Sequence, residues 1–232
     1  MTNFGKGKTP TAEQRREAEA DLTGLRIAEL RIDPVRGNFD AAHLREINRR
    51  IFQDLPELGF TDVTPGVFRP TAPPDLDWVK ARSLETVSVV TSFIAYSPMD
   101  KAARARLDKV LKGVNPSKLS KLKTAEFTQA IAQLYTEIDY IHPFRDGNSR
   151  TLREFTRELA EVSGYVIEWE RFNKSPAGRD ILYIARDIGV NRLALPHVQH
   201  FGTKRDITLS TDQLAGNRDL PDLLRDAVYK LG

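Results

Sequence analysis

The chain of 232 residues contains no cysteine, which excludes disulfide bonds and metal sites built from thiolates. The chain also has no large excess of charge of either sign. Its formal net charge of +3 is too small to indicate a nucleic-acid-binding protein. Long hydrophobic runs are missing: the longest, over residues 87–96, is interrupted by hydroxyl residues and is too short to cross a membrane. The first residues lack the apolar core of a secretory signal. We therefore expect a cytoplasmic protein with no membrane segment and no direct nucleic-acid ligand.

The composition that is present is ordinary for a folded, soluble protein, with 40% hydrophobic and 29% charged residues. Thr11 is a candidate N-cap for a helix over residues 11–30. Apolar residues at helical spacing predict further helices over residues 39–54 and 78–96. Two more are expected near residues 179–188 and 220–231. Residues 1–10 are expected to be disordered.

The most informative stretch begins with an imidazole and reads His142-Pro143-Phe144-Arg145-Asp146-Gly147-Asn148-Ser149-Arg150, followed by Arg153. A neutral imidazole can take a proton from a hydroxyl, because its ordinary pKa of about 6.5 lies near neutral pH. Asp146 is a carboxylate of the kind that holds Mg²⁺ together with phosphate oxygens. Phe144 is the apolar member, and we expect it to seat the loop in the core.

The second half of this stretch has the residue types of a phosphate site. Gly147 and Asn148 enter left-handed backbone conformations at low cost, and their peptide N–H groups can point at an anion. Arg150 and Arg153 are three residues apart, hence on one helix face, and a guanidinium suits bidentate contacts with phosphate. The whole stretch therefore has the parts needed to bind a nucleoside triphosphate.

Helical patterns flank the stretch on both sides. Apolar residues recur at helical spacing from Phe127 to Ile141, which predicts a helix that ends at His142. The same period runs from Leu152 to Val162, and Gly164 is a plausible C-cap. The sequence therefore predicts a helix–loop–helix with the polar stretch in the loop.

This stretch resembles the signature of the Fic family, His-Pro-Phe-x-(Asp or Glu)-Gly-Asn-(Gly or Lys)-Arg with a second Arg three residues later. The departure is Ser149, where Gly or Lys is usual, and we expect its small hydroxyl to be tolerated. A weaker likeness to the first half of the Fic core lies over residues 37–54. The resemblance covers roughly residues 20–170 and is strongest over residues 135–157.

The resemblance implies an all-α fold, a Fic-type helical bundle with a small β-hairpin, the flap, over the active site. We accordingly expect an N-terminal arm over residues 1–20, a Fic core over 21–170 and a C-terminal helical extension over 171–232. A Pro-Gly turn between two β-prone pieces makes residues 61–70 the candidate flap, with an ordinary surface turn as the alternative. The flap residues expected to dock the target are Thr64, Pro65, Gly66, Val67 and Phe68.

The activity implied by the resemblance is that of a protein adenylyltransferase. Such an enzyme transfers AMP from ATP to a Ser, Thr or Tyr hydroxyl of a target protein and releases pyrophosphate. His142 is then the base and Asp146 the ligand of Mg²⁺. The nucleotide and its phosphates are expected to contact Phe144, Gly147, Asn148, Ser149, Arg150 and Arg153. Alternatives within the family are transfer of UMP, phosphate or phosphocholine, or a catalytically silent Fic-fold adaptor.

The resemblance also bears on how the activity is inhibited. Many Fic proteins carry an inhibitory helix whose Glu pairs with the second Arg of the signature. That helix reads (Ser or Thr)-x-x-x-Glu-(Gly or Asn), and no Glu in this chain is followed by Gly or Asn. We therefore expect a small antitoxin-like protein to supply a Glu to Arg153. The alternative is an unrestrained enzyme, such as an effector delivered into another cell.

A run of lysines and arginines over residues 101–123 contains a single acid, Asp108. Helical spacing and Pro116 predict a helix followed by a loop, with a basic outer face. This face is either simply solvated or a docking surface for an acidic or nucleic-acid-associated target.

Overall fold

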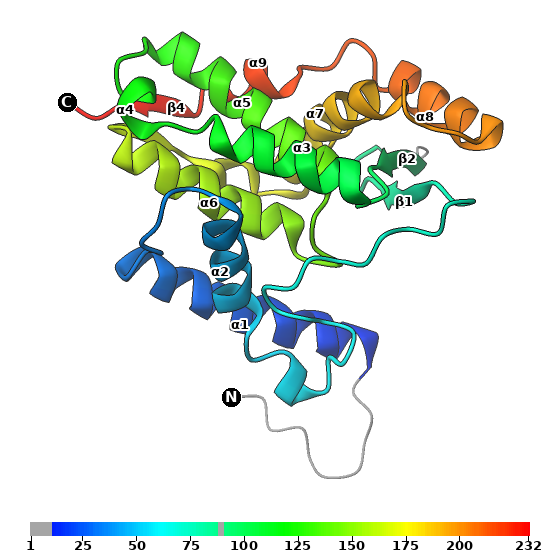
Figure 1. The fold of residues 1–232 in the computed structure, drawn as a ribbon, viewed down its shortest axis with the longest axis horizontal. Coiled ribbons are helices and arrows are strands. Elements are labelled where there is room, and N and C mark those ends of the chain that lie inside the picture. Colours follow the sequence, from blue (N-terminus) through cyan, green and yellow to red (C-terminus); the bar gives the residue numbers. More distant parts are fainter. Residues whose placement is uncertain (1–10, 88–90) are drawn as a thin grey trace.

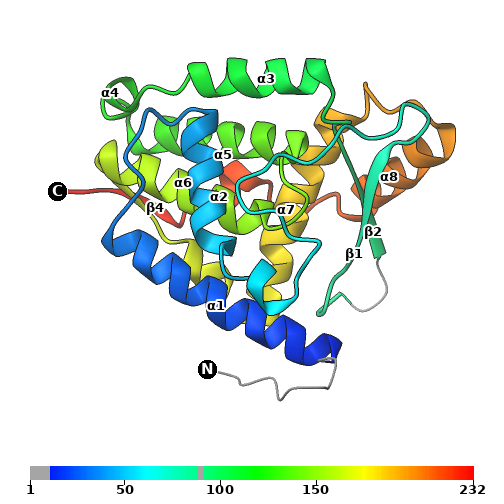
Figure 2. The same cartoon turned by 60° about the horizontal axis from the view of Figure 1, so that its bottom comes forward.

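The computed structural model describes residues 11–87 and 91–232, and most of them lie in helices (Figure 1). Helix α5 packs against α3, α6, α7 and α9, while α1 and α2 pack on each other and α2 also packs on α6. Figure 2 shows α1 running below α2 and α6 along one side of the molecule. The helices are α1 (Ala12–Ile32), α2 (Ala41–Phe52), α3 (Lys101–Lys112), α4 (Pro116–Leu119), α5 (Thr124–Ile141), α6 (Asn148–Val162), α7 (Pro176–Ala194), α8 (Phe201–Gln213) and α9 (Leu220–Leu224).

Each of the first two helices begins after a side chain that caps it. Thr11 and Gln14 form a reciprocal capping box at the start of α1, so the predicted N-cap is confirmed. Asp40 caps α2 by accepting a hydrogen bond from the peptide N–H of His43 at 3.0 Å. Residues 1–10, expected to be disordered, lie outside the described residues.

The predicted helix–loop–helix is confirmed. Helix α5 ends at His142, whose φ of 50° is left-handed. Gly147, with a φ of 74°, precedes α6. Gly164, with a φ of 79°, follows the C-cap Ser163 of α6. Helix α5 is buried along one face and α6 over most of its surface, so the loop is fixed at both ends.

The hairpin lies in a different place from the one expected. Strand β1 (Trp78–Ser83) pairs antiparallel with β2 (Thr91–Tyr96), so the predicted helix over residues 78–96 is wrong. The apparent helical spacing there extended over two strands and their connection. The aromatic and β-branched residues of this stretch favour strands. The predicted hairpin over residues 61–70 is also wrong, because the stretch contains turns and only one isolated bridge, between Phe68 and Phe144.

The C-terminal part adds a second small sheet. Strand β3 (Tyr165–Ile167) pairs antiparallel with β4 (Val228–Lys230), so the predicted helix over 220–231 holds only for α9. The predicted helix near 179–188 is confirmed within α7, whereas α8 was not predicted. Short 3₁₀ turns complete the chain, η1 (Pro56–Leu58) and η2 (Trp169–Phe172).

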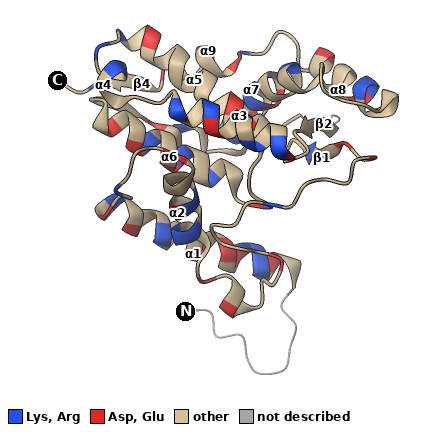
Figure 3. Ribbon diagram, in the orientation of Figure 1, with Lys and Arg blue, Asp and Glu red and all other residues tan. Residues whose placement is uncertain are grey.

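One hydrophobic core includes buried residues from Leu30 to Val228. The expected boundaries after residues 20 and 170 fall inside α1 and η2, and the division of the chain there stays a prediction. Helix α3 carries the predicted basic face, with Lys and Arg exposed along its length (Figure 3). Among the described residues, no helix combines the length and the apolar character that a membrane span requires.

Candidate active site

A cavity of about 570 Å³ opens beside the loop between α5 and α6, within the range of ordinary ligand pockets. Its walls come from α1, the β1–β2 hairpin, this loop, the start of α6 and α7. The structure brings together at this cavity the predicted residues His142, Asp146, Gly147, Asn148, Ser149, Arg150 and Arg153. Phe144 lies beneath the loop instead, 2% exposed, as expected for a residue that seats it in the core.

His142 is buried at the edge of this cavity, with its ring 3.9 Å from the ring of Tyr96, centroid to centroid. Neither ring nitrogen has a hydrogen-bond partner among the described residues. Burial lowers the pKa of the imidazole to about 4, although the nearby Asp139 carboxylate favours the charged form. The ring is therefore neutral at neutral pH, which is the state that a general base requires.

The stretch over residues 61–70 supports the loop from below. The Arg69 guanidinium is buried and donates to the carbonyl oxygens of Ile141, His142 and Ser97. Its peptide N–H donates to the carbonyl of Pro143 at 2.8 Å. A cation at this place suits the C-terminus of α5, where the last carbonyls of a helix have no partner within the helix.

The predicted flap residues Thr64 to Phe68 do not line the cavity. Gly66 is tied to α2 instead: its N–H donates to Asn48 Oδ1 at 2.8 Å, and its carbonyl accepts from Arg45 Nε at 2.7 Å. Phe68 packs against Phe144 at 5.3 Å between ring centroids. Their place over the cavity is taken by the β1–β2 hairpin, which contributes Lys80, Arg82 and Tyr96.

The turn itself is held by side chains of its own sequence. Asn148 spans the loop, because its side chain accepts from the N–H of Phe144 at 2.9 Å and donates to the carbonyl of the same residue at 2.8 Å. At Gly147 a Cβ would come within 2.0 Å of the Phe52 ring, so only glycine fits. Asp146 Oδ1 accepts from the N–H of Gly147 at 2.7 Å, and the carboxylate is exposed at the cavity.

The cations around the cavity differ in how they are neutralised. Four arginines form ion pairs with carboxylates: Arg82 with Asp187, Arg150 with Glu19, Arg179 with Glu85 and Arg186 with Asp139. Within the described part of the chain, Lys80 and Arg153 have no carboxylate within 4.0 Å. Burial lowers the pKa of both groups. Uncompensated positive charge at a partly buried site favours an anionic ligand.

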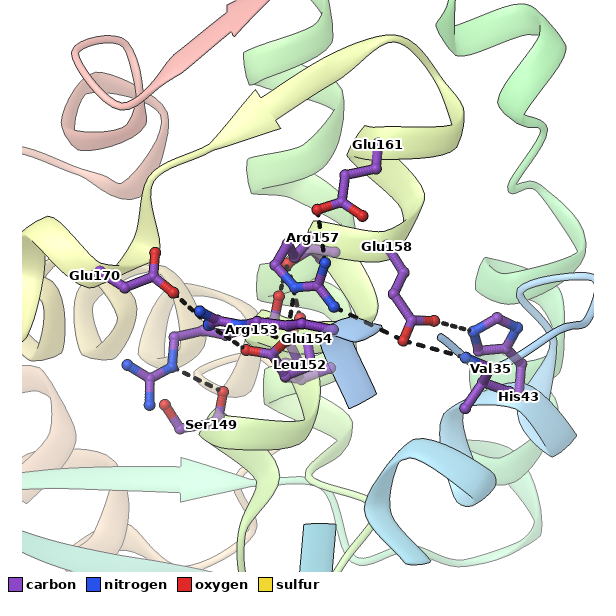
Figure 4. A network of polar contacts seen from close by, with 12 residues as sticks. Val35, His43, Ser149, Leu152, Arg153, Glu154, Arg157, Glu158, Glu161 and Glu170 are labelled. Carbon is purple, nitrogen blue, oxygen red and sulfur yellow. Dashed lines mark hydrogen bonds and ion pairs between the residues drawn. The ribbon is translucent and has the colours of Figure 1, made fainter. Parts of the chain in front are cut away.

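Arg150 and Arg153 therefore stand in different environments. Arg150 donates to Glu19 and Thr23 of α1 and lies over the Phe52 ring, 4.8 Å from its centroid. Arg153 donates to the carbonyl of Ser149 at 3.3 Å (Figure 4). It also donates to the side-chain oxygen of Asn173, the residue after η2, at 3.0 Å.

A network of charged side chains fixes α6, which carries both arginines, to the N-terminal helices (Figure 4). Glu158 accepts from the peptide N–H of Val35 and lies 2.8 Å from Nε2 of His43. Arg157 donates to Glu154 at 2.7 Å, and Glu154 in turn accepts from Arg31 of α1 at 2.9 Å. These contacts set the orientation of the helix on which Arg150 and Arg153 lie.

Sequence reasoning missed most of the cavity wall, and Lys80, Asp139 and Arg186 are three of the missed residues at or beside the cavity. Asp139 had a readable signal, since it lies one helical turn before His142 on the same face. Lys80 had no such signal in the sequence, because its strand was predicted as a helix. Arg186 reaches the site from α7, and no local pattern links it to Ser149.

The described residues contain no group of three or more His, Cys, Asp or Glu side chains that could hold a metal ion. Asp146 is the one carboxylate among the described residues that line the cavity. Mg²⁺ commonly binds proteins through one or two carboxylates together with phosphate oxygens. The residues thus fit a magnesium ion that arrives with a phosphate ligand, and do not fit a metal held by protein alone.

Comparisons with known proteins agree with these features. The Fic/DOC family matches residues 38–160. The chain is 28% identical over 162 residues to the protein adenylyltransferase VbhT of Bartonella schoenbuchensis, covering 69% of this chain and 29% of VbhT. It is 28% identical over 165 residues to a probable protein adenylyltransferase Fic of Escherichia coli, covering 70% of each. The chain therefore spans less than a third of the first relative's length.

Solved structures of similar fold include two Bartonella proteins described as VirB-translocated effectors. BepC of Bartonella tribocorum, with bound AMPPNP, has a TM-score of 0.63 and 17% identity, covering 96% of this chain and 90% of that one. The Fic domain of a Bartonella quintana effector, with bound ADP, has a TM-score of 0.57 and 20% identity, covering 97% and 90%. At these identities the likeness concerns the fold.

Proposed function

The chain belongs to the Fic/DOC family, and from this premise we propose that it is a protein adenylyltransferase that transfers AMP from ATP to a hydroxyl of a target protein. The observation that carries the proposal is that one cavity combines a neutral, buried imidazole, an exposed carboxylate and two cations that no carboxylate of the described residues offsets. Relatives named protein adenylyltransferase support it.

In the proposed reaction, His142 takes the proton of the target hydroxyl while the hydroxyl oxygen attacks the α-phosphorus. The bond from that phosphorus to its bridging oxygen breaks, and pyrophosphate leaves. The base is ready at neutral pH because burial lowers the pKa of its imidazole. Most of the remaining acceleration comes from positioning and from charge stabilisation.

The phosphates would lie against the turn and its cations. Gly147, Asn148 and Ser149 present the N-terminal end of α6, where peptide N–H groups and the helix dipole favour an anion. Arg153 and Lys80 offer the charge that no carboxylate offsets. Asp146 would hold Mg²⁺ against the phosphates, and the ion would neutralise their developing negative charge.

The hairpin replaces residues 61–70 as the proposed flap. Strand β1 pairs only with β2 among the described residues, so its other edge is free to pair with an extended segment of the target. Pairing of this kind uses backbone groups and tolerates different target sequences. The side chain of Lys80 marks the strand as part of the cavity wall.

Control by a partner remains part of the proposal: a small antitoxin-like protein would supply a Glu to Arg153, which no carboxylate of the described residues reaches. Delivery as an effector into another cell is the second arrangement, supported by the fold likeness to translocated Bartonella proteins. In either case the enzyme acts on protein targets in a cytoplasm.

The deciding experiment is incubation of the purified chain with a bacterial or host lysate, Mg²⁺ and ATP labelled at the α-phosphate. Transfer of label to protein by the wild type, and none by His142→Ala, is the expected result. UMP, phosphate and phosphocholine carry none of this label, so mass spectrometry of the lysate proteins, labelled or not, separates transfer of AMP from these alternatives. Nucleotide binding without any transfer would favour the silent adaptor instead.

A further inference from the structure

A buried chain of polar contacts joins the base to the phosphate turn and lies outside the Fic signature. Asp139 Oδ1 lies 3.7 Å from His142 Nδ1, one turn earlier on α5. Both oxygens of Asp139 accept from the Arg186 guanidinium, each at 3.0 Å. Arg186 Nη1 also donates to Ser149 Oγ at 3.1 Å. Asp139 and Arg186 are 1% and 2% exposed, so this chain of contacts is shielded from water.

We propose that Asp139 and Arg186 are positioning residues for the transfer reaction, with Asp139 orienting the His142 ring and Arg186 fixing Asp139 and the Ser149 turn relative to each other. This inference rests on the proposed function, because it assigns how the base and the phosphate site are aligned.

The orientation of the ring follows from its surroundings. Asp139 is the carboxylate closest to the imidazole, and its charge favours the tautomer with the proton on Nδ1. The other ring nitrogen, Nε2, is then left with a free lone pair to accept a proton. A separation of 3.7 Å exceeds a hydrogen bond, and contacts of this kind commonly tighten when substrate binds.

The guanidinium explains how a charged carboxylate can be kept in this buried place. Burial alone would raise the pKa of Asp139, but Arg186 and His142 outweigh burial and the pKa falls to about 2. Two parallel hydrogen bonds leave the carboxylate with one orientation. The carboxylate is thus charged and fixed throughout the neutral range.

Ser149 connects the same guanidinium to the phosphate turn. It is the position at which this chain departs from the Fic signature, and its hydroxyl contacts an arginine from α7, beyond the residues that match the family. A glycine there would lack this contact, and a lysine would bring a second cation beside Arg186. The serine therefore fits the arginine, and the two together link the turn to the base.

The test uses the full chain with two variants. Asp139→Asn removes the charge next to the ring but leaves Arg186 buried without its counter-ion, which can prevent folding. Asp139→Asn with Arg186→Met removes both charges and avoids that problem. The matched control is Glu137→Gln with Arg106→Met, which removes an ion pair on the same helix that contacts α3 and not the cavity.

Two readouts distinguish positioning from a merely structural role. We expect kcat for transfer to fall by about 100-fold in the double variant, the size of effect that misplacement of a catalytic group produces. The dissociation constant for Mg-ATP, measured by titration calorimetry, should stay within about threefold, because the loss concerns the transition state. The control variant should have the kcat and the Mg-ATP dissociation constant of the wild type.

Nitrogen-15 spectra report the ring tautomer without any need for activity. The His142 signal is identified among the four histidines by its loss in His142→Ala. We expect the proton on Nδ1 in the wild type and a mixture of tautomers in the double variant. A wild-type ring protonated on Nε2 overturns the proposal, as does a folded double variant with unchanged kcat. If the wild type transfers nothing, the proposed function fails, and the tautomer still decides this inference.

Discussion

At His142, the backbone and the side chain perform separate tasks. The left-handed backbone ends α5 and turns the chain into the loop, while the ring faces Tyr96 and the cavity. The sequence could predict the first task, because the apolar pattern stops just before this residue. It could not predict the burial of the ring, because Tyr96 comes from a strand far away in the sequence. The local sequence thus identifies the kind of side chain at the site, whereas the pKa of that side chain depends on neighbours that are distant in the sequence.

The lowered pKa of His142 has a consequence for the pH dependence of activity. Since burial places the pKa of the imidazole at about 4, the base stays unprotonated well below pH 6.5. We expect the acidic limb of kcat/KM, which reports the free enzyme, to lie nearer pH 4 than pH 6.5. The measurement is a pH profile of transfer to one purified target. An acidic limb centred near pH 6.5 in a protein that is still folded would contradict the assignment.

The same ring makes the folded state sensitive to acid. Between pH 6.5 and about 4 the unfolded chain binds a proton on His142 that the folded protein does not bind. The free energy of unfolding therefore decreases as the pH falls through this window. Circular dichroism at each pH of the profile separates this loss of structure from loss of the base.

Gly147 and Gly164 form a matched pair for testing the turn. Both have a left-handed φ, of 74° and 79°, but a Cβ meets the Phe52 ring only at Gly147. We expect Gly164→Ala to lower the free energy of unfolding by about 1–2 kcal/mol, the cost of that conformation alone. Gly147→Ala should cost about 1–3 kcal/mol more through overpacking and should also abolish transfer. Urea unfolding measures the difference in unfolding free energy between the two variants. Equal losses of unfolding free energy at the two sites would show that the Phe52 ring moves aside for the Cβ.

At the scale of elements, the helices around the loop were predictable and the hairpin was not. Helix α2 and the helices at the loop have strong periodic patterns, and α2 also has a capping side chain, Asp40. Residues 78–96 contain apolar spacing that fits a helix. The strands form because they pair with each other and because β2 packs on α7 and α8. The Pro-Gly turn at residues 65–66 was read correctly as a turn, but its flanks bind α2 and the loop.

Arg69 is the residue by which the stretch over 61–70 acts on α5. Arg69→Met leaves the carbonyl oxygens at the end of that helix without their donor, and the side chain also loses its place over the Trp78 ring, 4.2 Å from the centroid. We expect the free energy of unfolding to fall by about 2–4 kcal/mol and transfer to fall because His142 is no longer fixed. Urea unfolding and a transfer assay measure the two effects.

The control for Arg69 is Arg45→Met, which removes a contact between α2 and the same stretch without touching α5. Its loss should be about 1 kcal/mol, because a single neutral acceptor is affected. If Arg69→Met cost no more than Arg45→Met, the guanidinium would not be supporting the end of α5.

At the scale of the whole molecule, the cavity exists because segments distant in sequence meet around one loop. The loop and its arginines were visible in the sequence as a compact string. The walls were not, since α1 contributes Thr23 and Gly24, the hairpin Lys80, and α7 Tyr183, and none of these follows a local pattern. Helix α1 begins within the expected N-terminal arm, and its Glu19 pairs with the signature residue Arg150.

The pair between Glu19 and Arg150 predicts how the N-terminal helix affects nucleotide binding. Glu19→Gln removes a negative charge beside the phosphate site and releases Arg150, which then adds its full charge to that of Arg153. We expect Mg-ATP to bind several-fold more tightly, by about 1 kcal/mol, as measured by calorimetry in a His142→Ala background that prevents turnover. Stability should change by less than about 1 kcal/mol, because the pair is partly exposed. Glu29→Gln, which removes an exposed pair on the same helix, should leave binding unchanged. Unchanged or weaker binding in Glu19→Gln would mean that the ion pair holds Arg150 in its productive position, so that α1 completes the site and does not compete with the ligand.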